Sequence, residues 1–431
     1  MSIFERTDPA YEEYIHILKA ELIPATGCTE PIAIAYAAAK AKETLGGVPE
    51  RCRVEASGNI IKNVKSVVVP NTGNLRGIEA ATAAGVVAGD PDVQLQVISH
   101  VSQEDRKAIL AYRESHEIEV VPSLTDKVFY IGITVWAGEN SAKVVIEDYH
   151  TNITRIEKNG VCLFVAENKA QEQPEAQEPN YDLLSVKRII AFADNVELAD
   201  VEPLIARQIE YNTAISNEGL RNSWGAQIGR TILKAQGNDV RVRARAAAAA
   251  GSDARMSGCE MPVVIVSGSG NQGMTASLPV IEYAKELQSS REQLLRALVV
   301  SNLITTHQKT SIGRLSAFCG AVSAGCGAAA GIAYLKGEEY TVIAHTIVNT
   351  LAILSGMVCD GAKPSCAGKI AMAVEAGLLG YEMYKYGGNQ FMDGEGIIKK
   401  GVDNTIVTVG RMAREGMRDT DREILHIMTD C

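Results

Sequence analysis

A short segment of Gln, Glu, Ala and Pro, Glu167–Pro179, divides the chain into two parts of different character. It has no periodic apolar face, so it predicts a linker, which we assign to residues 167–182. Before the linker, short strand-like runs alternate with helical ones; after it, the pattern is almost wholly helical. We therefore expect an α+β fold, in which a mixed α/β N-terminal region is followed by a large, mostly helical domain.

The chain has 431 residues, which is enough for two or three domains. We predict N-terminal helices over 1–48 that pack on the catalytic region, a mixed α/β domain over 49–166, and a helical catalytic domain over 183–431. Aromatic residues make up only 5% of the chain, whereas it has 38 glycines. The interior must therefore consist of small and aliphatic side chains, with closely packed helices.

Apolar runs bounded by turn residues predict the strands of the mixed region. These runs are Cys52–Ala56, Val64–Val69 and Val93–Val101, with a hairpin of Phe129–Ala137 and Ser141–Tyr149.

The formal net charge of -10 argues against a nucleic-acid partner, because phosphate binding needs a basic face. The one basic cluster, Arg241–Arg245, is interpreted as a solvated or salt-bridged helix face. The polar N-terminus is neither a secretory signal nor a transit peptide, and no run of 18 apolar residues is uninterrupted. We expect a cytoplasmic protein that acts on a small molecule, without membrane contact; a homodimer is compatible with the sequence.

Nine cysteines, an odd number, agree with a reducing compartment in which none forms a disulfide. Five of them lie after residue 300, and this clustering favours a metal site. Gly361 and Pro364 place Cys359 and Cys366 on a loop between helices, where Lys363 would favour their thiolates. The alternative is a helix-connecting turn with two incidental thiols.

Cys319 and Cys326 would lie on one face of a helix, too far apart to bind one compact cluster together. One of them is expected to bind metal and the other to pack. With three thiolate ligands, one metal keeps an open coordination position, and this metal can act on substrate as a Lewis acid. Structural zinc is the rival, but the close cysteine pairs typical of zinc sites do not occur here.

Cys28 immediately precedes a helix that Thr29 is placed to cap, so its thiol should ionise readily and act as a general base, with Glu30 nearby. A small buried residue in a tight turn is the alternative. The glycine-rich loop Ser267–Gly273 matches a dinucleotide fingerprint in spacing alone, because no βαβ unit follows it. A carboxylate-binding loop is favoured, and the candidate substrate-binding residues are Ser269, Asn271, Gln272 and Lys363. His307 is either a proton shuttle or a structural histidine.

Three motifs resemble the L-cysteine desulfidase family, which is related to the alpha-chain part of iron–sulfur L-serine dehydratases. They are Ala25-Thr-Gly-Cys28-Thr-Glu-Pro31, Cys319-Gly-Ala-Val-Ser-Ala-Gly325 and Cys359-Asp-Gly-Ala-Lys363, and the likeness runs along nearly the whole chain. The resemblance implies a [4Fe–4S] cluster held by Cys319, Cys359 and Cys366. It also implies that Cys28 is the proton acceptor.

The implied reaction is PLP-independent α,β-elimination, in which L-cysteine and water give pyruvate, ammonia and hydrogen sulfide. One alternative is a dehydratase of L-serine or a related β-substituted amino acid. Another is a non-catalytic iron–sulfur sensor of redox state or sulfur. Cys431 is a candidate fourth ligand, because a terminal cysteine can cap the open iron in dehydratases of this kind.

Overall fold

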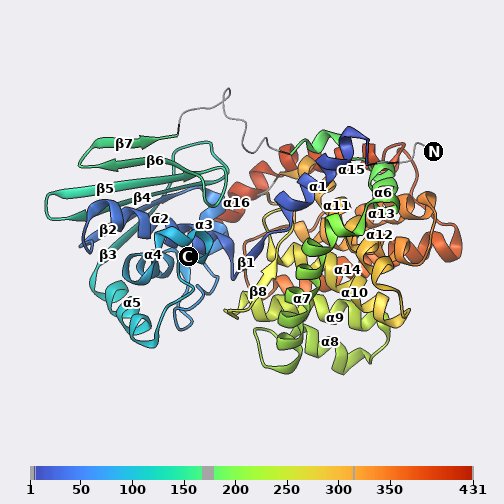
Figure 1. The fold of residues 1–431 in the computed structure, drawn as a ribbon, viewed down its shortest axis with the longest axis horizontal. Helices are drawn as coiled ribbons and strands as arrows, with labels where there is room; N and C mark the ends of the chain where they lie inside the picture. The colour runs from blue at the N-terminus through green and yellow to red at the C-terminus, as the bar shows by residue number, and fades with distance from the viewer. Residues whose placement is uncertain (1–3, 5, 167–178, 314–315, 430–431) are drawn as a thin grey trace.

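The computed structural model describes residues 4, 6–166, 179–313 and 316–429, which form two lobes side by side (Figure 1). One lobe holds a six-stranded sheet covered by helices, and the other is built almost wholly of helices. The expected α+β fold, with a mixed N-terminal region and a mostly helical C-terminal region, is confirmed. No described helix is long and apolar enough to cross a membrane.

The sheet lobe is a mixed sheet with helices packed on one face. Its strands run in the order β3-β2-β4-β5-β6-β7, with β2 and β3 parallel and the other neighbours antiparallel. Along β2, buried Cys52 and Val54 alternate with exposed Arg51 and Arg53, so one face meets the helices and the other meets solvent. The strands are β2 (Arg51–Ala56), β3 (Glu117–Pro122), β4 (Tyr130–Ala137), β5 (Asn140–Glu147), β6 (Ile153–Lys158) and β7 (Val161–Val165). The helices are α2 (Thr29–Leu45), α3 (Gly58–Val64), α4 (Gly77–Ala88) and α5 (Gln103–Ser115).

Two strand predictions in this lobe are wrong. Val64–Val69 is the end of α3 and an irregular segment, and Val93–Val101 overlaps the 3-10 helix η1 (Pro91–Gln96). The Asp90 side chain accepts a hydrogen bond from the Asp92 amide and starts the 3-10 turn. Short apolar runs indicate burial, but they do not distinguish a strand from a buried turn. The predicted hairpin, in contrast, is confirmed as β4 and β5.

The helical lobe packs helices closely through alanine and glycine. An added Cβ at Gly219 of α7 would lie 2.0 Å from the carbonyl oxygen of Ala250 in α9, so only glycine allows this approach. Beside it, the Ser216 hydroxyl donates to the Ala247 carbonyl at 2.8 Å. The elements of this lobe are α1 (Pro9–Glu21), η2 (Tyr181–Leu183), α6 (Val186–Asn195), α7 (Leu198–Arg221), α8 (Ile228–Gln236), α9 (Val240–Met256), α10 (Gly270–Glu286), α11 (Arg291–Ile312), α12 (Gly320–Leu335), α13 (Tyr340–Leu354), α14 (Cys366–Gly387), α15 (Val402–Arg411), the π-turn η3 (Met412–Gly416) and α16 (Arg418–Thr429).

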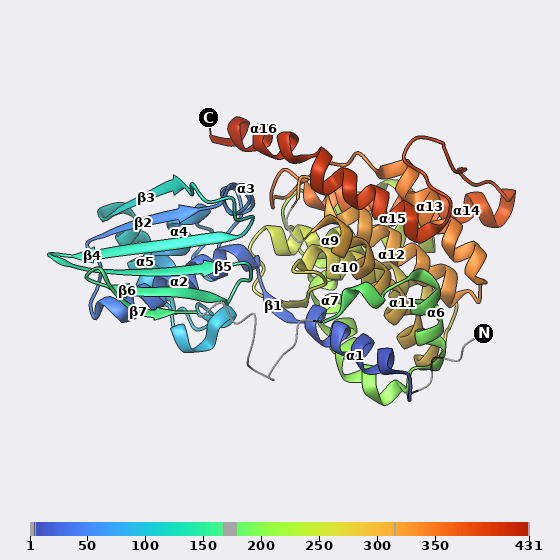
Figure 2. The ribbon, with the colours of Figure 1, turned by 90° about the horizontal axis from the view of Figure 1, so that it is seen from above.

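Two segments tie the lobes together. Strand β1 (Pro24–Thr26) pairs antiparallel with β8 (Pro262–Val264), just before the chain enters α2. Helix α16 extends from the helical lobe toward the sheet lobe (Figure 2), where Asp421 pairs with the buried Lys62 of α3. The side chains of α1 belong to the core of the helical lobe, whereas those of α2 belong to the core of the sheet lobe. The division at residues 48, 166 and 182 stays a prediction.

We expect Gly219→Ala to lower the free energy of unfolding by about 1–3 kcal/mol, because the added methyl group forces α7 away from α9. Urea and thermal unfolding measure this change. Gly368→Ala is the matched control, since Gly368 also lies in a helix but an added Cβ would meet nothing within 4 Å. The control should be neutral or stabilising by up to about 1 kcal/mol. Equal stability of the two variants would contradict the close packing of α7 on α9.

Candidate active site

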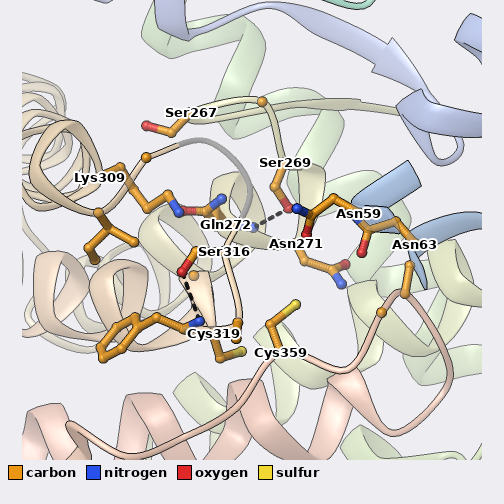
Figure 3. A pocket seen from close by; sticks show the side chains of 18 of the residues that line it. Asn59, Asn63, Ser267, Ser269, Asn271, Gln272, Lys309, Ser316, Cys319 and Cys359 are labelled. Atoms are coloured by element: carbon orange, nitrogen blue, oxygen red, sulfur yellow. Dashed lines mark hydrogen bonds between the residues drawn. The ribbon is translucent and has the colours of Figure 1, made fainter. Parts of the chain in front are cut away.

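A cavity of about 540 Å³ lies between the two lobes. The sheet lobe contributes Cys28, the α3 residues Asn59 and Asn63, and residues 148–150 after β5. The helical lobe contributes its three cysteines, Cys319, Cys359 and Cys366, and the glycine-rich loop. Arg418 and Asp421 of α16 line the same cavity. Figure 3 shows Asn59 and Asn63 across from Cys319 and Cys359. The cavity therefore needs both lobes and the C-terminal helix to be complete.

Four of the helices at this cavity begin at a cysteine or a serine. Cys28 is the N-cap of α2, Ser269 of α10 and Cys319 of α12, while Cys366 is the first residue of α14. Thr29, predicted as the cap of α2, is instead its first helical residue. A helix N-terminus favours negative charge because its first amides point outward without intrahelical partners. The site is therefore suited to anionic ligands and thiolates.

Cys319 and Cys359 are held by a short antiparallel contact between two loops. The Cys319 amide donates to the Met357 carbonyl at 3.0 Å, the Cys359 amide donates to the Ala317 carbonyl at 2.6 Å, and Phe318 bridges Val358 between them. Both side chains line the cavity, next to each other in Figure 3.

Cys366 reaches the same cavity from the start of α14, after the turn at Gly361. Gly361 has a φ of +92°, and an added Cβ would lie 2.2 Å from the Lys62 carbonyl oxygen, so this turn requires glycine. The Cys366 thiol donates to the Gly361 carbonyl at 3.6 Å. The turn thus places the third thiol against α3 of the sheet lobe.

The three thiols influence one another electrostatically. Burial, followed by the neighbouring Cys359, raises the pKa of the Cys319 thiol to about 12. Burial also raises the pKa of Cys366, against the lowering effect of Lys363 and Lys369. Lys363 does lower the pKa of Cys366, as expected, but burial of this thiol outweighs the lysine. A cationic metal centre between the thiols would instead lower their pKa values and favour the thiolates.

The donor set fits an iron–sulfur cluster better than a single ion. Within the described part of the chain, no three His, Cys, Asp or Glu side chains surround one point as ligands of a single metal ion would. The irons of a cluster occupy separate corners, so its cysteines stand further apart than ligands of one ion. Three thiols that line one cavity fit that arrangement.

Cys28 lines the same cavity as a buried, hydrogen-bonded thiol. Its Sγ donates to Oε2 of Glu30 at 3.1 Å, and Glu30 also accepts from the Thr29 hydroxyl and the Asn63 amide, both at 3.2 Å. Burial, then the Glu30 charge, raises the pKa of Cys28 well above its ordinary value, while Arg255 opposes the rise. The predicted readily ionised thiol is therefore wrong for the resting site, because burial and the carboxylate outweigh the helix N-terminus.

The glycine-rich loop lies next to Cys28 because β8, which precedes the loop, pairs with β1, which precedes Cys28. The Ser269 hydroxyl accepts from the Gln272 amide and starts α10 (Figure 3). Asn271 and Gln272 line the cavity, and Oε1 of Gln272 is buried with no hydrogen-bond partner among the described residues. The three loop residues predicted to bind substrate therefore do surround the cavity.

Other predicted residues lie elsewhere. Lys363 is not among the residues that line the cavity; its ammonium group pairs with Asp360 inside the loop. Cys326 is buried within α12, where burial raises its pKa to about 12, so it packs. His307 pairs with Asp403 at 2.8 Å away from the lining residues. Cys431 lies outside the described residues.

Sequence analysis missed Arg255, Lys309 and the lining residues of α16. None of these residues has a motif of its own, and they come together only when α9, α11 and α16 pack around the cavity.

Comparison with known proteins agrees with this architecture. The family model "Serine dehydratase alpha chain" matches residues 92–426. UPF0597 protein DSY1109 of Desulfitobacterium hafniense is 59% identical, covering 98% of this chain and 98% of the relative. A UPF0597 protein of Lachnoclostridium phytofermentans is 51% identical over 97% of this chain and 99% of its own length. UPF0597 protein FN1147 of Fusobacterium nucleatum is 44% identical over 97% and 99%. The predicted relationship is confirmed: the chain belongs to the serine dehydratase alpha-chain family.

Proposed function

We propose that this protein is an iron–sulfur-dependent lyase that converts L-cysteine and water to pyruvate, ammonia and hydrogen sulfide. The observation that carries the proposal is the placement around one cavity of three thiols, one buried and two partly buried, and of a fourth, buried and hydrogen-bonded thiol. Membership of the serine dehydratase alpha-chain family supports a lyase-type reaction and an iron–sulfur cofactor. L-Serine is the second candidate substrate, favoured by that same family.

In this proposal Cys319, Cys359 and Cys366 hold a [4Fe–4S] cluster. The bound cluster supplies a Lewis-acidic iron that weakens the bond to the β-substituent. The remaining requirement is a base for the Cα proton, because elimination breaks the Cα–H bond as the β-substituent leaves with its electron pair.

Cys28 and Glu30 provide that base as a pair. The thiol proton already points at Oε2 of Glu30. Its transfer to the carboxylate leaves a thiolate, which then takes the Cα proton. The thiolate is formed next to the N-terminus of α2, which favours the negative charge. Asn63 holds the other carboxylate oxygen of Glu30, so the acceptor stays in place during the transfer.

We expect anaerobically purified protein to carry about four irons per chain and to release pyruvate and sulfide together from L-cysteine. Cys359→Ala should lose the cluster absorbance, most of the iron and all turnover. Cys326→Ala should keep all three, because Cys326 packs inside α12. Iron content, absorbance and product assays measure these outcomes.

Each other outcome has a defined meaning. Turnover of L-serine but not L-cysteine would make the protein a dehydratase. A cluster without turnover of either amino acid would favour a sensor. Protein that binds no iron under any anaerobic condition would overturn the proposal.

We expect Cys28→Ala to retain normal iron and absorbance but to lose at least about 100-fold in turnover, because the base is removed and the metal site is not. Glu30→Gln should also keep its iron and lose turnover, since an amide cannot accept the thiol proton. Cys52→Ala is the matched control, as another buried thiol in the sheet lobe outside the cavity. A fully active Cys28→Ala enzyme would rule out Cys28 as the base.

A further inference from the structure

Arg255 is a buried arginine that no carboxylate of the described residues neutralises. Its side chain lies at the end of α9, and the residue is only 4% exposed. Nη2 donates to the Gly27 carbonyl at 2.8 Å, Nη1 makes a long contact of 3.4 Å with Oδ1 of Asn271, and Nε has no acceptor. Burying a cation without an anionic partner is unfavourable, so this side chain is expected to serve a ligand.

The other arginines of α9, in contrast, are paired with carboxylates. Arg245, with 10% of its side chain exposed, pairs with Glu375 at 3.1 Å. Arg241 pairs with Glu375 and Glu382, and Arg243 pairs with Glu282 and Glu286. This basic cluster is therefore a salt-bridged face, as predicted, whereas Arg255 differs from it in lacking a carboxylate.

The position of Arg255 is built into the surrounding loops. The side chain lines the cavity, and its Gly27 contact is the residue directly before Cys28. An added Cβ at Gly270 would lie 2.5 Å from Nε and 2.8 Å from Cζ of Arg255. Gly270 therefore makes room for the guanidinium group, which explains one glycine of a loop whose spacing matches a dinucleotide fingerprint without the fold for it.

We infer that Arg255 is a substrate-binding residue that anchors the α-carboxylate of an amino acid beside Cys28. A planar guanidinium binds a carboxylate through two parallel N–H bonds, which fixes the orientation of Cα as well as its position. The buried, unpartnered Oε1 of Gln272 in the same cavity accepts a hydrogen bond from the substrate ammonium group. The inference rests on the proposed function in one respect, namely that the substrate is an amino acid.

Direct binding tests this inference without requiring turnover. Isothermal titration calorimetry of the anaerobically purified protein with three probes distinguishes the contributions of the ligand's carboxylate and ammonium groups to binding. The probes are L-serine, glycerate, which keeps the carboxylate but not the ammonium, and ethanolamine, which keeps the ammonium but not the carboxylate. We expect ethanolamine to bind at least about 10-fold more weakly than L-serine, as for the loss of a hydrogen bond to a charged group.

Arg255→Lys should weaken binding of L-serine and glycerate by about 10- to 100-fold, because a lysine cannot form the bidentate contact. It should leave ethanolamine binding unchanged. Arg245→Lys is the matched control, a mostly buried arginine of the same helix with a carboxylate partner, and should bind all three probes as the wild type does. Gly270→Ala keeps the arginine but displaces its guanidinium group, and it should reproduce the loss for both carboxylates.

Gly270→Ala also provides the test if Arg255→Lys does not fold, as judged by circular dichroism and thermal unfolding. Wild-type binding of L-serine by a folded Arg255→Lys or Gly270→Ala variant would overturn the inference, as would equal wild-type affinity for L-serine and ethanolamine. If both carboxylates bind through Arg255 but no amino acid is turned over, the anchor stands and the proposed reaction fails. If cysteine is turned over with unchanged KM in Arg255→Lys, the reaction stands and the anchor fails.

Discussion

The convergence of four helix N-termini on one cavity is the constraint on which the rest of the site depends. Each N-terminus carries about half a positive charge and several amides without intrahelical partners. Packed together, α2, α10, α12 and α14 create a region where negative charge is favoured. Burial, together with neighbouring charges, raises the pKa of Cys28, Cys319 and Cys366 there. Binding of a cation, or loss of a proton, would therefore change which of these groups are charged.

Close packing of small residues makes this convergence geometrically available. Helices that begin at a common point crowd one another unless their contact faces carry small residues. In α12, an added Cβ at Gly325 would lie 2.6 Å from the carbonyl oxygen of Ala373 in α14. The scarcity of aromatic residues and the abundance of glycine follow from that requirement. Large aromatic side chains pack against one another around α1 instead, where Phe4, Tyr11, Tyr14 and Phe192 form a buried cluster.

Sequence reasoning located the cysteines, the glycine-rich loop and the two-part architecture, because each leaves a local pattern. It failed where the outcome depends on surroundings that only the fold supplies. The ionisation of Cys28 was misjudged because its burial and the turn of Glu30 toward it are not local properties. Arg255 was missed because nothing in the sequence distinguishes it from the paired arginines earlier in α9. The buried apolar runs near residues 64 and 93 were read as strands for the same reason.

The crossing of α16 to the sheet lobe has a consequence for the order in which the cavity is assembled during synthesis. Domains fold as units while the chain emerges at about 5–20 residues per second. Arg418 and Asp421 follow every other lining segment along the chain, and Asp421 meets Lys62 of α3, a residue translated far earlier. The earlier segments can therefore assemble around a cavity that is still open on the α16 side. Until α16 is synthesised, the cavity lacks Arg418, Asp421 and the ion pair between Asp421 and Lys62, so its last wall is placed only at the end of synthesis.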